Sequence, residues 1–89
     1  MNLQVTIEVW KKDNRYLART PELDFISQGE TTEEAKKNLL EVINIQFKEM
    51  KELGTLNDYL AECGFASNEN TIVSHSEMIG FERSTFVIP

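Results

Sequence analysis

The stretch "PELDFISQGETTEEAKKNL", from Pro21 to Leu39, contains the transition that decides the fold. Its segment "DFISQ" has the apolar and β-branched residues of a short strand. Gly29 allows the backbone to turn sharply out of the sheet. Thr31 and Glu34 have the spacing of a capping box, which starts a helix. The stretch therefore predicts a strand, a turn and a helix start, and its polar residues have structural duties rather than catalytic ones.

Two further strands are expected before this stretch. Residues 2–9 alternate between apolar and polar side chains, as a half-buried strand does. The segment "RYLART", residues 15–20, returns beside them after a two-residue turn at Asp13-Asn14. If Asp13-Asn14 is the two-residue turn, four pairs face each other: Lys11 with Tyr16, Trp10 with Leu17, Val9 with Ala18, and Glu8 with Arg19. A four-residue loop would give the same faces, whereas a loop of three or five residues would invert them. One face of the hairpin then carries Ile7, Val9, Tyr16 and Ala18 toward the core, and the other carries Glu8, Trp10, Leu17 and Arg19.

A long amphipathic helix is expected from about Thr32 to about Leu53, with Gly54 as its stop. Its inner stripe has three- and four-residue spacing and comprises Ala35, Leu39, Val42, Ile43, Gln46, Phe47, Met50 and Leu53. Ile45 lies well off this stripe, and Leu40 lies at its edge.

The remaining residues predict smaller elements. A short helix is expected in "TLNDYLAECGF", opened by a second capping box of Thr55 and Asp58 and closed by Gly64 with Phe65 as an apolar latch. "ASNEN" is expected to be a loop, and "TIVSH" a short strand or an extended arm. "STFVIP" has the residues of a final edge strand.

Together these elements predict an α+β fold, in which a three-stranded antiparallel sheet packs on one long helix in the order β-β-β-α-β. A short second helix and a C-terminal edge strand complete it. We expect a single domain over residues 1–89, with a β-β-β-α core in residues 1–53 and the smaller elements in residues 54–89.

Amino-acid composition indicates which kind of partner and which cellular compartment to expect. The formal charge of -6 and the pI near 4.7 disfavour direct nucleic-acid binding and suit a basic protein partner. Cys63 has no partner cysteine, so a reducing cytoplasm is the expected location. No apolar run approaches the length of a membrane span, and no secretory signal is recognisable.

No catalytic, cofactor-binding or metal-ligating set is predicted. His75 is the only histidine, which disfavours a zinc site, and Cys63 reads as a small buried apolar group. Glu8, Asp13 and Asp24 lie on or beside strands, where a metal nuclease could hold them. Arg19 opposite Glu8 favours an ordinary cross-strand ion pair instead.

Three apolar residues are candidates for a protein interface. Trp10 and Leu17 are adjacent on the sheet face opposite the helix, and Ile45 protrudes from the helix. A tryptophan beside an aliphatic residue is the composition of an interface anchor.

Residues 16–47, "YLARTPELDFISQGETTEEAKKNLLEVINIQF", resemble the HicB-like antitoxin family. Members commonly show an aromatic-x-Ala-x-x-Pro-x-Leu strand, a small-polar-Gly-acidic-Thr junction, and Glu-Ala at the start of an amphipathic helix. The matching residues are Tyr16, Ala18, Pro21, Leu23, Ser27, Gln28, Gly29, Glu30, Thr31, Glu34 and Ala35.

The resemblance implies a partial ribonuclease-H-like β-β-β-α-β unit that binds and neutralises a small basic mRNA-cleaving toxin of the HicA type. It also implies dimers or higher homo-oligomers. Many members continue from Pro-x-Leu into Pro-Gly-Cys, where this chain has Asp24-Phe25-Ile26. Many also carry a C-terminal DNA-binding segment, whereas the residues after Phe65 predict loop and strand. The alternative is a stand-alone oligomerisation or small-ligand module without a toxin partner.

Overall fold

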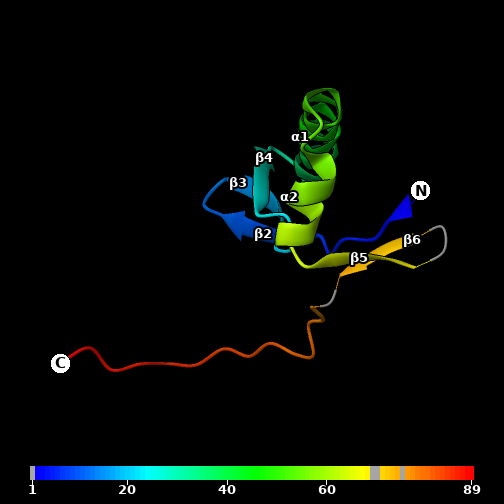
Figure 1. Cartoon of the computed structure of the whole chain (residues 1–89). Helices are drawn as coiled ribbons and strands as arrows, with labels where there is room; N and C mark the ends of the chain where they lie inside the picture. The colour runs from blue at the N-terminus through cyan, green and yellow to red at the C-terminus, as the bar shows by residue number, and fades with distance from the viewer. Residues whose placement is uncertain (1, 69–70, 75) are drawn as a thin grey trace.

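The computed structural model describes residues 2–68, 71–74 and 76–89, and these residues form an α+β fold (Figure 1). Within them, two three-stranded sheets accompany one long and one short helix. The elements in chain order are β1 (Asn2–Leu3), β2 (Glu8–Lys12), β3 (Arg15–Thr20), β4 (Phe25–Gly29), α1 (Thr32–Leu53), α2 (Leu56–Glu62), β5 (Phe65–Asn68) and β6 (Thr71–Ser74).

The first sheet has the order β2-β3-β4 and is antiparallel throughout. Its hairpin register is the one expected from a two-residue turn, with Trp10 opposite Leu17 and Glu8 opposite Arg19. Asp13 takes the positive φ of 56° that the tight turn needs, whereas Asn14 does not. The expected three-stranded sheet is therefore confirmed, and the register confirms the four expected facing pairs, whereas Ile7 lies outside β2.

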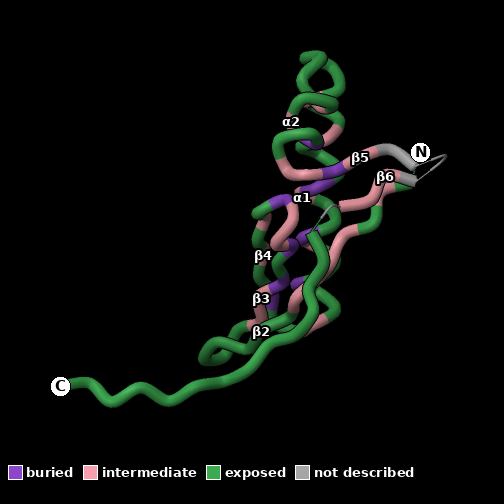
Figure 2. The backbone as a smooth tube through the Cα atoms, turned by 60° about the horizontal axis from the view of Figure 1, so that its bottom comes forward, coloured by how far each residue is buried: buried purple, intermediate pink, exposed green. Residues whose placement is uncertain are grey.

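Helix α1 crosses one face of this sheet, and the core forms between them (Figure 2). The helix begins and ends at the expected residues. Among the described residues the buried apolar set is small: Ala18, Leu23, Ala35, Leu39, Ile43, Leu60 and Phe65. Two members of the expected inner stripe, Gln46 and Leu53, are exposed instead, because the second half of α1 extends past the sheet.

Both ends of α1 are capped by local hydrogen bonds. The Thr31 hydroxyl accepts from the Glu34 amide at 3.0 Å, which is half of the expected capping box. At the other end Gly54 has φ 75°, its amide donates to the Lys51 carbonyl, and the Thr55 amide donates to the Met50 carbonyl. This pair of bonds is a Schellman motif, so the Gly54 stop is confirmed.

Gly29 is required for a different reason from the expected one. Its φ is not in the left-handed region, so no unusual backbone turn demands glycine. A Cβ at this position would lie 2.6 Å from the Ala35 amide nitrogen and 2.9 Å from the Glu34 carbonyl carbon. Gly29 therefore permits the end of β4 to pass against the backbone of the first turn of α1.

The expected continuous strand over residues 2–9 is wrong. The segment divides into β1 and β2, which belong to different sheets, and residues 4–7 cross between them. Strand β1 pairs in parallel with β6, with Asn2 facing Thr71. The alternation of side chains predicted extended backbone correctly, but it could not reveal that the strand changes partner.

The second sheet has the order β1-β6-β5 and was not expected as a unit. The start of "ASNEN" is strand rather than loop, because Phe65–Asn68 pairs antiparallel with Thr71–Ser74. The short strand in "TIVSH" is confirmed, while His75 lies outside the described residues.

Helix α2 joins the two sheets. Its expected capping box is wrong, since Thr55 makes no side-chain cap bond to the helix start and its hydroxyl bonds the Met50 carbonyl at 3.4 Å. Gly64 has φ 84° and Phe65 is buried, which confirms the expected stop and latch.

The expected strand in "STFVIP" is wrong, because residues 76–89 have no regular secondary structure and every one of them is exposed. We call these residues the C-terminal arm, and it extends from the second sheet past the first sheet (Figures 1 and 2). The radius of gyration is 15.5 Å, compared with about 12 Å for a compact chain of this length. The arm accounts for this difference.

Candidate functional site

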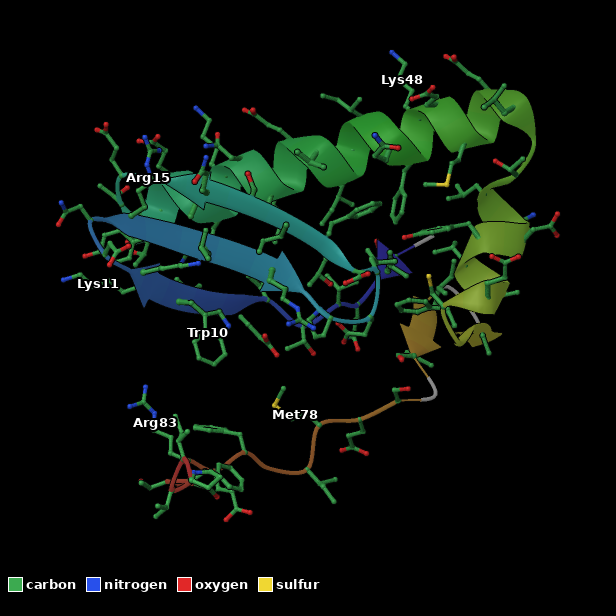
Figure 3. The ribbon with its side chains drawn as sticks, turned by 90° about the vertical axis from the view of Figure 1, so that its left-hand side faces the viewer. Trp10, Lys11, Arg15, Lys48, Met78 and Arg83 are labelled. Carbon is green, nitrogen blue, oxygen red and sulfur yellow. The ribbon has the colours of Figure 1, made fainter. Side chains whose placement is uncertain are left out.

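The face of the first sheet opposite α1 carries a row of apolar side chains. Trp10 is 55% exposed and projects from β2 away from α1 (Figure 3), and Leu17 faces it across the hairpin. Ile26, on β4, is exposed and pairs with Arg19, so it lies on the same face. We call Trp10, Leu17 and Ile26 the Trp10 face. Ile26 was not identified from the sequence as part of this face; it lies diagonally from Leu17, which itself pairs with Gln28.

Ile45 lies on a separate surface. It is 63% exposed and points away from the buried residues of α1, which face the sheet. Residues three and four positions apart are neighbours on a helix, so Ile45 lies beside Glu41, Glu49 and the basic Lys48, with Glu52 a further turn along, all of them exposed. We call Glu41, Ile45, Glu49 and Glu52 the acidic ridge. The three expected interface residues therefore do not form one surface, since Trp10 and Leu17 lie beneath the sheet and Ile45 lies on the outside of α1.

Charge is distributed unevenly between these surfaces. Residues 8–20 contain four basic and two acidic side chains, a formal charge of +2, whereas the whole chain carries -6. The rest of the chain therefore carries -8. The hairpin beside Trp10 is locally basic, whereas α1 contains five acidic and four basic side chains, a formal charge of -1, and residues 21–31 and 54–89 carry the remaining -7.

The ion pair expected between Glu8 and Arg19 is present at the edge of the Trp10 face. Arg19 Nε lies 4.0 Å from Glu8 Oε1, and the Trp10 indole N–H donates to the same carboxylate oxygen at 3.2 Å. Both partners are solvent-accessible, so the pair contributes about 0–1 kcal/mol to stability. Its larger effect is to orient the indole ring.

Glu22 is the most heavily hydrogen-bonded carboxylate among the described residues, and sequence reasoning missed it. Its oxygens accept from the Thr6 amide at 3.0 Å, from the Thr6 hydroxyl at 2.7 Å and from the Thr20 hydroxyl at 3.3 Å. Burial alone would raise the pKa of Glu22, but the hydrogen bonds outweigh it and lower the pKa below its ordinary value. This carboxylate holds the crossing segment between β1 and β2.

Tyr59 makes a comparable attachment for α2. Its hydroxyl donates to the Leu23 carbonyl at 2.7 Å, and its ring stacks on Phe25 with centroids 6.1 Å apart. Burial, followed by the side chain of Cys63 and the nearby Asp24 charge, raises the pKa of Tyr59 to about 12. The phenol therefore stays protonated and acts as a structural donor.

The carboxylates considered for a metal nuclease have structural explanations. Asp13 and Asp24 both occupy left-handed turn positions, with φ of 56° and 59°, and Glu8 pairs with Arg19. Within the described ranges no three acidic, histidine or cysteine side chains are grouped closely enough to hold a metal ion.

An open hollow lies between the C-terminal half of α1, α2 and the second sheet. Its volume is about 460 Å³, and it is lined mainly by apolar side chains with Lys51 at its rim: Leu3, Phe47, Leu56, Leu60 and Ile72. This is within the size range of small-molecule pockets. Few polar groups converge on it, so it offers little chemical specificity.

Comparison of the chain with protein-family models, with curated proteins and with solved structures found no match. Among the residues with described structure, neither helix combines the length and the apolar character needed to span a bilayer.

Proposed function

We propose that this chain is a non-enzymatic antitoxin-like protein that binds and neutralises a small basic HicA-type mRNA-cleaving toxin. The resemblance of residues 16–47 to HicB-like antitoxins supplies the class of partner. The observation that carries the proposal is the acidic ridge, because exposed carboxylates around one apolar side chain fit a basic protein surface.

The ridge provides a physical route to neutralisation. An enzyme that cleaves RNA uses lysine and arginine side chains to hold phosphates. Carboxylates repeated along one helix face can pair with the same cations and compete with RNA for them. Ile45 would then be buried at the centre of the contact, which contributes about 2 kcal/mol. The net charge of -6 adds long-range attraction.

Co-expression with a HicA-type toxin tests this proposal. We expect a stable complex on size-exclusion chromatography and relief of toxin-induced growth arrest. Glu41→Lys with Glu49→Lys should weaken the complex by at least tenfold, because each change replaces attraction by repulsion at the ridge.

The matched control is Glu30→Lys with Glu62→Lys, which makes the same charge change at two exposed positions away from the ridge. It should retain binding. Failure to form any complex contradicts the proposal, and equal weakening by both double variants contradicts the assignment to the ridge.

A second candidate is a stand-alone oligomerisation or small-ligand module. The unpacked arm and the apolar hollow between α1 and α2 favour it. Sedimentation of the isolated chain, with and without toxin, separates the two functions. A homo-oligomer that excludes toxin supports this second candidate.

A further inference from the structure

The solvent-exposed area of the chain is larger than that expected for a compact monomer of the same mass. The exposed area is 7364 Å², whereas about 5,400 Å² is expected for a folded monomer of this mass. The excess of about 2,000 Å² per chain would give a pair of copies an interface in the range of obligate dimers. The arm supplies much of this excess, since Ile79, Phe81, Phe86, Val87 and Ile88 are 85–97% exposed.

The end of the arm has the composition of a strand covered on both faces. In "STFVIP", Phe86 and Ile88 alternate with Val87, so an extended backbone presents apolar side chains to both sides. No strand follows Ser74 within the described residues, so this segment is unpaired in the structure. It needs the open edge of a sheet to form a strand.

An edge suited to this strand exists on β2. The sheet order β2-β3-β4 leaves one side of β2 without a pairing strand. On this strand Val9 faces the helix side and Trp10 the opposite side, and they are 40% and 55% exposed. The edge therefore offers an apolar neighbour on each face, which matches the two-sided pattern of residues 84–88.

Charge does not oppose this pairing. Strand β2 ends in Lys11 and Lys12, which protect an edge from indiscriminate association. Residues 84–88 carry no charge, and the part of the arm before them contains Glu77, Glu82 and Arg83. Figure 3 shows that the arm runs beyond the β2 edge, on the side toward which Trp10 projects. Met78 lines a shallow hollow together with Thr6 and Glu22. The residues of the arm after Met78 are all exposed.

We propose that residues 84–88 of one copy add as a fourth strand to the β2 edge of a second copy, and that the exchange is reciprocal. Backbone hydrogen bonds then satisfy the open edge, and Phe86 and Ile88 pack beside Trp10 or Val9. A twofold dimer with exchanged arms results. Toxin binding at the acidic ridge is independent of this contact, because the ridge lies on the outside of α1.

The only tryptophan in the sequence is Trp10, so its fluorescence reports on this contact directly. We expect a dimer by sedimentation, with Trp10 emission that shifts to the blue and resists iodide quenching as concentration rises. Phe86→Ser with Ile88→Ser should raise the dimer dissociation constant about a hundredfold or more and restore exposed emission. The matched control, Leu40→Ser with Leu53→Ser, removes two exposed apolar groups from α1 and should leave both measurements unchanged.

Two further measurements test strand pairing and exchange. Thr85→Pro keeps the apolar groups but disrupts the strand, and it should also dissociate the dimer. To test exchange, two variants are mixed. The first carries Trp10→Phe and keeps the native arm, and the second keeps Trp10 and carries Phe86→Ser with Ile88→Ser. A blue shift on mixing shows that the arm of one copy covers Trp10 of the other.

The proposal is overturned by any of three results. A monomer at all concentrations excludes the dimer, whether or not the arm folds back on its own β2. A dimer in which Trp10 remains exposed places the contact elsewhere. A dimer that tolerates Thr85→Pro excludes strand addition.

Discussion

Two residues are closely constrained by their surroundings, Gly29 at the junction between β4 and α1 and Glu22 between β3 and β4. Gly29 lies against backbone atoms of the first helical turn, and backbone cannot move aside as a flexible side chain can. Glu22 is equally constrained, because its two oxygens bind three donors from two segments. Both residues make their contacts within the fold, so we expect substitutions of them to change stability.

Gly29→Ala should destabilise the fold by about 1–3 kcal/mol, because the added methyl overlaps the Ala35 amide and forces the helix away from β4. Urea unfolding followed by circular dichroism measures this. Gly80→Ala is the control, since a Cβ there meets no atom within 4 Å, and it should change stability little. Equal stability of the two variants would show that the strand and helix can separate without cost.

Glu22→Gln should destabilise the fold at neutral pH by about 1–2 kcal/mol, because charge-assisted hydrogen bonds to Thr6 and Thr20 weaken. Folding lowers the pKa of Glu22 from 4.5, so its stabilisation is present above pH 4.5 and is lost as pH falls through the folded-state pKa.

The difference between wild type and Glu22→Gln should therefore shrink in acid. Denaturant unfolding at neutral pH and near pH 3 measures it, with the exposed Glu30→Gln as control. A difference that is the same at both pH values would contradict the assigned role of the ionised carboxylate.

At the scale of elements, α2 is attached to the first sheet by a hydrogen bond and an aromatic contact of Tyr59, in addition to apolar packing. Its Tyr59 hydroxyl reaches the turn between β3 and β4, and its ring stacks on Phe25. Leu60 adds the buried apolar contact. The position of the second sheet depends on this short helix, since β5 follows it almost directly.

Tyr59→Phe should cost about 1–2 kcal/mol, because the Leu23 carbonyl loses its donor. Folding raises the pKa of Tyr59 to about 12, so this stabilisation is complete below pH 10 and disappears as pH rises through 12. An absorbance titration of phenolate should show a component near pH 12 that Tyr59→Phe removes and Tyr16→Phe retains. Retention of the late component in Tyr59→Phe would assign it to another group.

Local signals predicted local elements well. The register of the β2–β3 hairpin follows from a two-residue turn, and the bounds of α1 follow from Thr31 and Gly54. The division of residues 2–9 could not be predicted, because alternation is the same whichever strand pairs. β5 could not be predicted for a related reason. This short segment forms a strand because it pairs with β6, and the sequence alone does not show that tertiary contact.

The interface residues show the same limit. The alternation of side chains along each strand predicted that Trp10 and Leu17 lie on the outer face of the sheet, and helical spacing predicted that Ile45 lies away from the core. Whether these surfaces join depends on which side of the sheet α1 occupies relative to them. The role of Gly29 required the distance between two backbones, which no sequence pattern contains.

The whole molecule combines a small core with an unusually extended surface. Seven apolar residues are buried among those described, and two of them are alanines. A core of this size gives limited stability, so burial of the arm in an assembly would contribute a large fraction of the total.

Hydrogen exchange should reveal this dependence on assembly. In dilute solution the amides of residues 84–88 should exchange at the rate of an unfolded peptide, while those in the centre of α1 exchange slowest. At high concentration residues 84–88 and β2 should gain protection together. Protection of the arm without a change in β2 would indicate a different docking surface.

The parallel pairing of β1 with β6 has a consequence for the order of folding. Asn2 meets Thr71, so almost the whole described chain separates the two strands. The β2–β3 hairpin, β4 and α1 make contacts between close neighbours in sequence and can form early, while closure of the longest loop has a large entropic cost. During synthesis, β1 must therefore wait unpaired until the last strand emerges, and the second sheet should form after the first.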